Sequence, residues 1–151
     1  GDRTENLLWR LQNGNLGGKP PLLVILLIGT NDLAYDGPPR SPELTAEGIR
    51  ADLLYLRQHL PKTPILLLGL LPRGASPEAP LRRKVAAVNR LISRCADRRT
   101  VFYADIGGAL LDARGRLTAE VSPDQLHFSE IGYARLAPLL AEMIDNLAGR
   151  S

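Results

Sequence analysis

Residues 22–28 form a run of seven apolar residues that no polar residue interrupts. Such a run is typical of a strand that is buried on both faces, as the inner strands of a parallel sheet are. It ends at Gly29 and is followed by Thr30, Asn31 and Asp32. Ligands of open α/β sheets bind beyond the carboxyl ends of the strands, so Asn31 is a candidate donor to a developing negative charge. An Asn-Asp pair also caps turns and helices, so a purely structural role stays open.

The other elements follow from the same kind of pattern. Continuous apolar runs predict two more strands, at 65–71 and 101–104. Apolar residues at helical spacing predict helices at 4–13, at 45–60, from Pro80 onward and after Ser129, a good N-cap. Proline and glycine predict a loop over 33–44 and a tight turn at 112–115. Strands that alternate with helices pair in parallel through right-handed crossovers, so the expected fold class is α/β.

The composition bounds the type of protein. A length of 151 residues suits a single domain, 1–151, and the 44% of hydrophobic residues are enough for one core. The net charge is +3, but the tightest basic groups, 82–84 and 98–99, have no aromatic residues between them. A solvated helix face explains these groups better than a nucleic-acid site, which needs an extended basic stripe.

Cys95 is the only cysteine, so the chain can form neither an internal disulfide nor a cysteine metal site. No apolar run reaches the roughly 20 residues of a membrane-spanning helix. The N-terminus lacks the charged-then-apolar pattern of a signal peptide. We therefore expect a soluble protein without a membrane span. The compartment stays open, with the cytoplasm slightly favoured.

Asp124 and His127 lie three residues apart in a loop that precedes the last predicted helix. An Asp can hold a nearby imidazole in one tautomer and stabilise its protonated form, which lets the His act first as a base and then as an acid. On its own the pair is more often structural than chemical. The other histidine, His59, lies at a helix end, where it favours the negative end of the helix dipole.

Several segments together resemble successive blocks of the SGNH, or GDSL-type, hydrolases. They are 1–14, 28–32, 69–74, 124–129 and the pair Gly132-Tyr133, and they occur in the family's order over nearly the whole chain. Within the family, these blocks resemble those of the catalytic subunits of intracellular platelet-activating factor acetylhydrolase and their bacterial homologues. The resemblance implies a three-layer, flavodoxin-like parallel sheet with helices on both faces.

The resemblance also implies a serine esterase site. Asn31 matches the side chain that helps to form the oxyanion hole, and Gly1 matches a glycine whose backbone N–H is a further oxyanion donor. Asp124 matches the triad acid and His127 the catalytic base. Such an enzyme takes a small-molecule acyl ester, here with a short acyl group favoured, and requires no metal and no cofactor.

The chain departs from the family at the nucleophile. The family carries its serine in a Gly-Asp-Ser block at the end of the first strand, and this chain has no such block. None of its serines has the expected strand-to-turn context; they are Ser41, Ser76, Ser93, Ser122, Ser129 and Ser151. The resemblance therefore implies an N-terminally incomplete domain that lacks the first two strands of the fold.

The missing strands would leave the predicted strand at 22–28 as an edge, although it is central in the family. A long, apolar, unpaired edge invites pairing with another chain. We expect either a missing N-terminal segment or a second copy of the chain, as in a homodimer, to pair with this strand. Two functions remain open: an esterase or acetylhydrolase whose serine lies outside this chain, and a noncatalytic binding or assembly subunit with the same fold.

Overall fold

The computed structural model describes residues 1–34 and 38–149. A sheet of three parallel strands lies at its centre, in the order β1 (Val24–Leu26), β2 (Ile65–Leu68) and β3 (Val101–Ala104). The parallel sheet and the bounds of β3 are as predicted. The other two strands end sooner than the apolar runs at 22–28 and 65–71 from which they were predicted.

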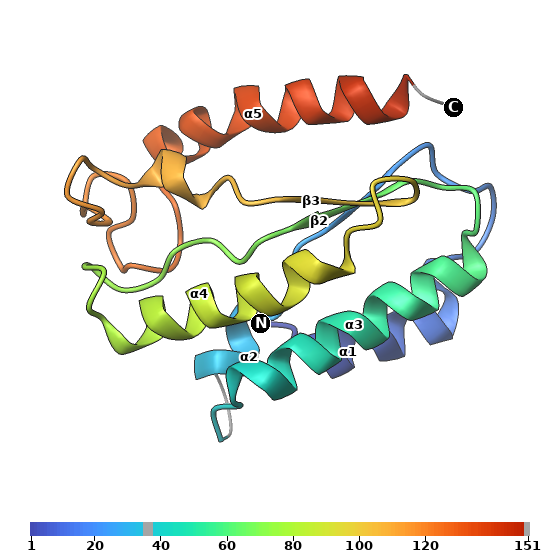
Figure 1. The fold of residues 1–151 in the computed structure, drawn as a ribbon, viewed down its shortest axis with the longest axis horizontal. Helices are drawn as coiled ribbons and strands as arrows, with labels where there is room; N and C mark the ends of the chain where they lie inside the picture. The colour runs from blue at the N-terminus through green and yellow to red at the C-terminus, as the bar shows by residue number, and fades with distance from the viewer. Residues whose placement is uncertain (35–37, 150–151) are drawn as a thin grey trace.

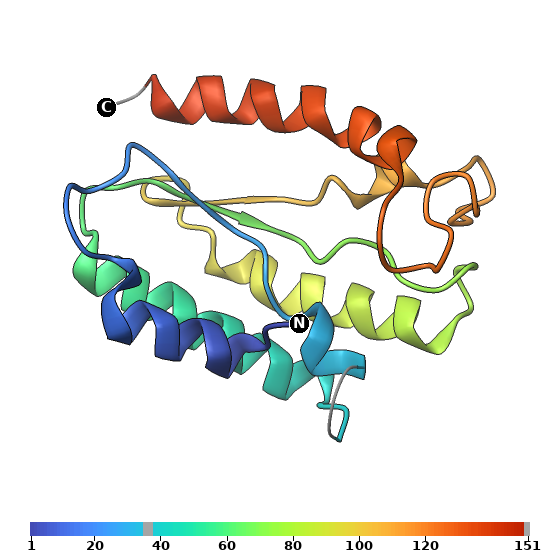
Figure 2. The same ribbon diagram turned by 180° about the vertical axis from the view of Figure 1, so that it is seen from behind.

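Helices cover both faces of the sheet in three layers (Figures 1 and 2). On one face lie α1 (Thr4–Arg10), α3 (Pro42–His59) and α4 (Pro80–Ile92). On the other face lies α5 (Glu130–Ala148). Short helical segments complete the chain; they are η1 (Leu11–Asn15), α2 (Thr30–Ala34), η2 (Ser93–Cys95) and η3 (Gly107–Leu110).

Several predicted helix and loop boundaries differ from the structure. The helix predicted at 4–13 is divided into α1, which ends at Arg10, and η1, within which Asn13 and Gly14 leave helical geometry; Gly14 has a φ of 110°. The loop predicted at 33–44 is helical at both ends, and its residues 35–37 lie outside the described part of the chain. The start of α3 is set by Ser41, whose Oγ accepts a hydrogen bond from the N–H of Leu44 at 3.2 Å.

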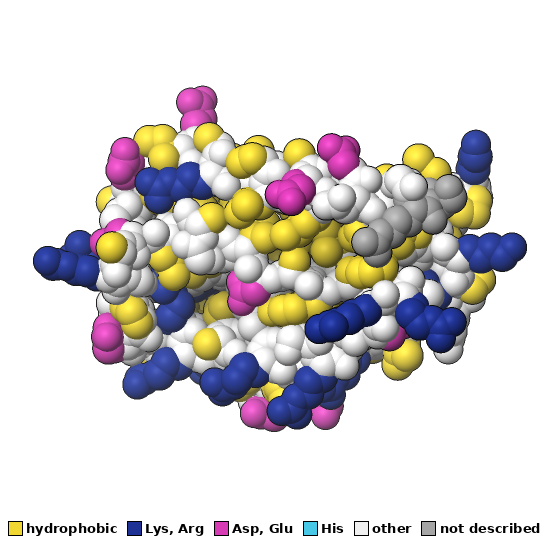
Figure 3. Space-filling model, turned by 45° about the horizontal axis from the view of Figure 1, so that its top comes forward, with side chains coloured by type: hydrophobic (Ala, Val, Ile, Leu, Met, Phe, Trp, Pro, Cys, Tyr) yellow, Lys and Arg dark blue, Asp and Glu magenta, His cyan; other side chains and the backbone are white. Residues whose placement is uncertain are grey.

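Strand β2 is buried along its whole length, as an inner strand of a parallel sheet should be. Its side chains alternate between two hydrophobic clusters. Ile65 and Leu67 pack with α3 and α4, and Leu66 and Leu68 pack with residues of α5. On the surface that brings α5 forward, hydrophobic side chains gather in a band across the middle while Lys and Arg are dispersed around its margins (Figure 3).

Strand β1 is an edge of the described sheet, since it pairs only with β2. Leu26 is buried against the α1 and α3 side, but Ile25 and Leu27 are 42% and 43% exposed on the other side. The prediction that 22–28 is covered on both faces is therefore wrong for this chain. From behind, β1 lies at the near edge of the sheet (Figure 2). A continuous apolar run shows that both sides of a strand suit burial, but it does not show what covers them.

A buried carboxyl group, Asp52, lies on α3 among apolar side chains. It is fully buried, and neither of its carboxylate oxygens has a hydrogen-bond partner among the described residues. Burial, followed by the negative charges of Asp32 and Glu5, raises the pKa of Asp52 to about 7. Arg40, which contacts both Asp32 and Glu5, is the cation of this group. Asp52 is therefore protonated in the folded protein at mildly acidic pH.

This shift predicts a pH-dependent stability. Between about pH 4 and pH 7 the folded state holds a proton on Asp52 that the unfolded chain releases, so the free energy of unfolding falls as the pH rises. Asp52→Asn should remove most of this dependence and stabilise the full-length protein at pH 8 by on the order of 2 kcal/mol. Urea unfolding at pH 5 and pH 8 measures both effects. Glu47→Gln, an exposed change on the same helix, is the matched control, and equal slopes for Asp52→Asn and the unchanged protein would contradict the prediction.

Candidate active site

The loop before α5 brings Asp124 and His127 into direct contact. His127 Nδ1 lies 2.6 Å from Asp124 Oδ2, and Asp124 Oδ1 accepts hydrogen bonds from the N–H groups of His127 at 2.7 Å and Leu126 at 3.0 Å. The hydrogen bond with the His127 ring, followed by those from the two amides, lowers the pKa of Asp124 to about 2. The carboxylate is therefore ionised at neutral pH and can hold Nδ1 as the protonated ring nitrogen. His127 Nε2 then remains as the proton acceptor.

Asn31 lies where the chain leaves β1. Gly29 makes the turn with a φ of 114°, and a Cβ at this position would lie 2.9 Å from Cδ1 of Ile49, so only glycine fits. After this turn, Asn31 Nδ2 donates a hydrogen bond to the carbonyl oxygen of Asp2 at 3.0 Å. A side-chain amide carries two N–H groups, so one donor remains after this bond is made.

One cavity of about 320 Å³ contains both Asn31 and His127 in its lining. It lies at the carboxyl ends of β1 and β2, where the α/β fold predicts a ligand site. The structure therefore brings the amide and the imidazole to one cavity, with Asp124 bonded to the imidazole. A neighbouring cavity of about 220 Å³ is lined by Asn31 and Asp2. Gly1 is not among the described residues lining either cavity, but it precedes Asp2, whose carbonyl accepts the bond from Asn31.

Asp32 has a structural role, which was one of the alternatives left open for the Asn31-Asp32 pair. Its side chain is fully buried and accepts hydrogen bonds from the N–H of Thr4 at 3.1 Å and from Thr4 Oγ1 at 2.7 Å. Arg40 Nη1 lies 2.9 Å from the same carboxylate. Asp32 therefore anchors the start of α1 and does not line either cavity at Asn31.

The cavity lining includes residues that were not predicted as site residues, among them Arg73, Phe128 and Tyr133. Phe128 and Tyr133 meet edge to face with ring centroids 6.2 Å apart, which builds an aromatic wall beside His127. Tyr133 is 61% exposed. Its place four residues after the cap Ser129, near the start of the helix that follows His127, was the available sequence signal. Arg73 lies in the block 69–74 that carries the family resemblance, but no role was predicted for it, because an arginine between proline and glycine resembles an ordinary loop residue.

The described residues that line the cavity include no serine or cysteine. Ser122 is buried and donates its hydroxyl hydrogen to the carbonyl oxygen of His127 at 2.8 Å. Ser129 caps α5, as predicted, by accepting from the N–H of Gly132 at 3.3 Å. Within the described ranges, no three His, Cys, Asp or Glu side chains are grouped so that they could hold a metal ion.

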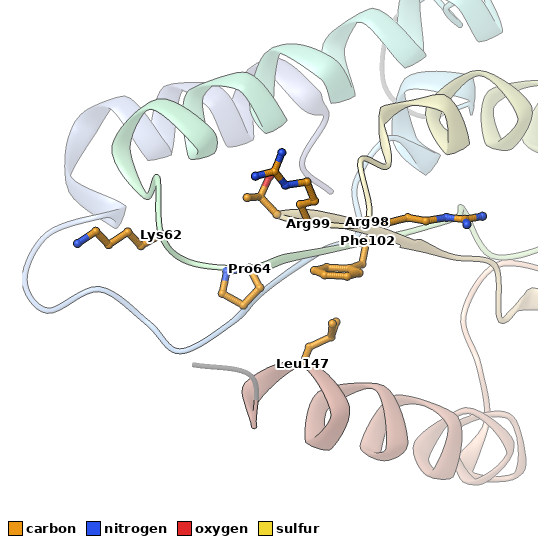
Figure 4. Close-up of a pocket in the computed structure, with 7 residues that line it drawn as sticks. Lys62, Pro64, Arg98, Arg99, Phe102 and Leu147 are labelled. Carbon is orange, nitrogen blue, oxygen red and sulfur yellow. The ribbon is translucent and has the colours of Figure 1, made fainter.

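A cavity of about 180 Å³ lies at the opposite end of the sheet, near the amino ends of β2 and β3. Its apolar floor is formed by Pro64, Phe102 and Leu147. The side chains of Lys62, Arg98 and Arg99 point in different directions and away from this floor (Figure 4). Cations that diverge in this way do not form a convergent anion site, so the cavity at Asn31 and His127 is the stronger candidate for chemistry.

Known proteins resemble this chain over most of its length. The family model for the GDSL-like lipase/acylhydrolase family matches residues 1–135. Over 148 residues the chain is 35% identical to platelet-activating factor acetylhydrolase IB subunit alpha2 of Rattus norvegicus, covering 97% of this chain and 62% of the relative. It is 31% identical to subunit alpha1 of Homo sapiens over 145 residues, covering 95% of this chain and 60% of the relative. The chain thus spans about three-fifths of the length of these curated relatives.

A solved structure shows the same fold. The crystal structure of a GDSL-like lipase from Bacteroides thetaiotaomicron superposes with a TM-score of 0.79, covering 96% of this chain and 72% of that chain. Its sequence identity is 19%, so this likeness concerns the fold. Separately, no helix within the described residues is long and apolar enough to cross a membrane.

Proposed function

Since the chain belongs to the GDSL-like lipase/acylhydrolase family, we propose that the protein hydrolyses a short-chain acyl ester by a Ser-His-Asp mechanism. The observation that carries the proposal is the shared cavity of Asn31 and His127, with Asp124 2.6 Å from the imidazole. The rat relative is an acetylhydrolase by name, which supports an acetyl group as the acyl group.

In the proposed reaction, His127 Nε2 takes the proton of the serine hydroxyl as the serine oxygen attacks the ester carbonyl. Asp124, already ionised, stabilises the imidazolium that forms. The free N–H of Asn31 and the backbone N–H of Gly1 donate to the oxyanion of the tetrahedral intermediate. His127 then gives its proton to the leaving alcohol, and water releases the acyl group from the serine by the same steps.

The serine of this mechanism lies, we propose, on a segment outside these 151 residues. The exposed side chains of Ile25 and Leu27 and the free edge of β1 suit a further strand, which would pair with β1 and end beside Asn31. A cavity of about 280 Å³ along Leu7, Leu11 and residues 24–28 supports the packing of this further segment against the same edge of the molecule. A second copy of the chain is the other candidate occupant of the edge.

Labelling with a fluorophosphonate probe tests the proposal, because the probe reacts only with an activated serine. The full-length protein should be labelled on a serine outside residues 1–151 and should hydrolyse p-nitrophenyl acetate. Heat-denatured protein is the control for non-specific labelling. No labelling and no ester hydrolysis would instead support a noncatalytic binding or assembly subunit, which is the function that the serine-free cavity favours as an alternative.

A further inference from the structure

Arg73 lies in the loop after β2 and reaches across to the loop after β1. Its Nη1 donates a hydrogen bond to the carbonyl oxygen of Thr30 at 3.0 Å, although the two residues are 43 positions apart in the chain. Thr30 directly precedes Asn31, and both residues line the cavity with Arg73. Arg73 therefore holds the backbone from which the Asn31 amide projects. The amide is held at its other end by the carbonyl oxygen of Asp2.

The same loop also contacts the segment of Asp124 and His127. The N–H of Gly74 lies 3.4 Å from the carbonyl oxygen of Gln125, a long hydrogen bond to the residue after Asp124. Gln125 has a φ of 62°, a strained conformation for a residue with a side chain, and Gly74 has a φ of 79°. The Arg73 charge is also attracted to Asp124, which opposes the lowering of the pKa of Arg73 that burial causes.

Helix α4 holds the loop of Arg73 and Gly74 through the side chain of Arg82. Arg82 donates from Nε to the carbonyl oxygen of Arg73 at 3.2 Å and from Nη2 to that of Gly74 at 2.7 Å. Its Nη1 donates to the carbonyl oxygen of Gly115 at 2.9 Å. Arg82 is thus a half-buried clamp, and the prediction that residues 82–84 form a solvated helix face is wrong at this residue. The clamp makes the loop of Arg73 a rigid support between the two halves of the site.

We propose that Arg73 is a positioning residue that sets the Asn31 amide relative to the Asp124–His127 pair. Its Nε is buried without a hydrogen-bond partner among the described residues. Burial of an unpaired N–H group costs free energy, and ordinary loop packing does not explain why the side chain is held in this way. The inference rests on the proposed function, because it concerns the geometry of the oxyanion donor. It gives Arg73 no contact with the reacting atoms; the arginine acts through Asn31.

A double-mutant cycle in the full-length protein tests this role with p-nitrophenyl acetate as the substrate. Arg73→Gln should lower kcat by about 10- to 100-fold and change KM by less than about threefold, because the donor is displaced while the cavity is kept. Arg73→Lys should recover part of the loss, since a single donor can still reach the Thr30 carbonyl. In an Asn31→Ala background, Arg73→Gln should lower kcat by less than about threefold, because the group that it positions is gone.

Arg57→Gln is the matched control, since Arg57 also donates to backbone carbonyls, those of Leu60, Pro61 and Thr63, but lines neither cavity at Asn31. It should leave kcat unchanged. If Arg73→Gln does not fold, as judged by circular dichroism, Arg73→Lys takes its place in the cycle.

The outcomes separate the two proposals. If the fold-loss of kcat in the double variant equals the product of the losses in Arg73→Gln and Asn31→Ala, the positioning role is overturned. A rise in KM at constant kcat in Arg73→Gln would also overturn it, because it would mark Arg73 as a substrate-binding residue. If Asn31→Ala and His127→Ala both keep normal turnover, the proposed function itself fails. If these two variants lose turnover and Arg73→Gln does not, only the role of Arg73 fails.

Discussion

His127→Ala in the full-length protein is expected to lower kcat for an acetyl ester by about 10⁴- to 10⁶-fold, the range seen when the base of a serine hydrolase is removed. Without the imidazole, the described residues that line the cavity include no other histidine and no carboxylate to accept the serine proton, and Asp124 stays bonded to backbone amides. Steady-state hydrolysis of p-nitrophenyl acetate measures the loss. Fluorophosphonate labelling should fall with it, since the serine is no longer activated.

The second histidine provides the matched control. His59 is exposed at the end of α3, where its ring stacks on Tyr55 with centroids 3.9 Å apart and its Nδ1 lies 2.9 Å from the Tyr55 carbonyl oxygen. It lines neither cavity at Asn31, so His59→Ala should keep kcat within about twofold of the unchanged protein. A His127→Ala variant that retains a tenth or more of the normal turnover would exclude His127 as the base.

Asn31→Ala should lower kcat by about 10²- to 10³-fold, which corresponds to about 2.7–4 kcal/mol of transition-state stabilisation. The amide donates to the oxyanion only as negative charge develops, so KM should change far less than kcat. Comparison of kcat and KM for the same acetyl ester separates the two effects. Loss of the bond from Asn31 to the Asp2 carbonyl also loosens the segment of Gly1, the second proposed donor.

Asn13→Ala controls for the removal of an exposed amide elsewhere in the chain. Asn13 Nδ2 also bonds to a backbone carbonyl, that of Trp9 at 2.7 Å, but the residue lies in η1 away from the cavity. Its kcat should match that of the unchanged protein. Equal turnover for Asn31→Ala and Asn13→Ala would remove Asn31 from the oxyanion hole.

Much of the layered fold could be predicted from the hydrophobic pattern, because each element carries its own periodicity. The bounds of β3 and the cap of α5 at Ser129 are confirmed. Strand β1 shows the limit of the method, since a run of apolar residues reports which sides of a strand suit burial and not which elements cover them. The start of α3 was missed because three prolines within 33–44 outweighed the cap at Ser41.

Within the candidate site, contacts between residues close in the sequence could be predicted, whereas contacts between distant residues could not. Asp124 and His127 could be paired from their spacing, because three residues of loop are short enough to bring the side chains together. The contact of Arg73 with Thr30 spans 43 positions and could not be read from either segment alone. Asp52 did carry a signal: it follows Ile49 by three residues on α3, so its carboxyl group falls on the buried stripe of an amphipathic helix.

The proposed acid and the proposed base both belong to the one short loop before α5, and the carboxylate of Asp124 accepts hydrogen bonds from the imidazole and from two amides of that loop. In hydrolases of the chymotrypsin type these two groups come from distant parts of the polypeptide, so their alignment depends on how whole subdomains dock. Here the dyad is a self-contained unit. Substitutions in the cavity wall, for example at the aromatic pair of Phe128 and Tyr133, can therefore change the substrate specificity and leave the geometry of Asp124 and His127 unchanged.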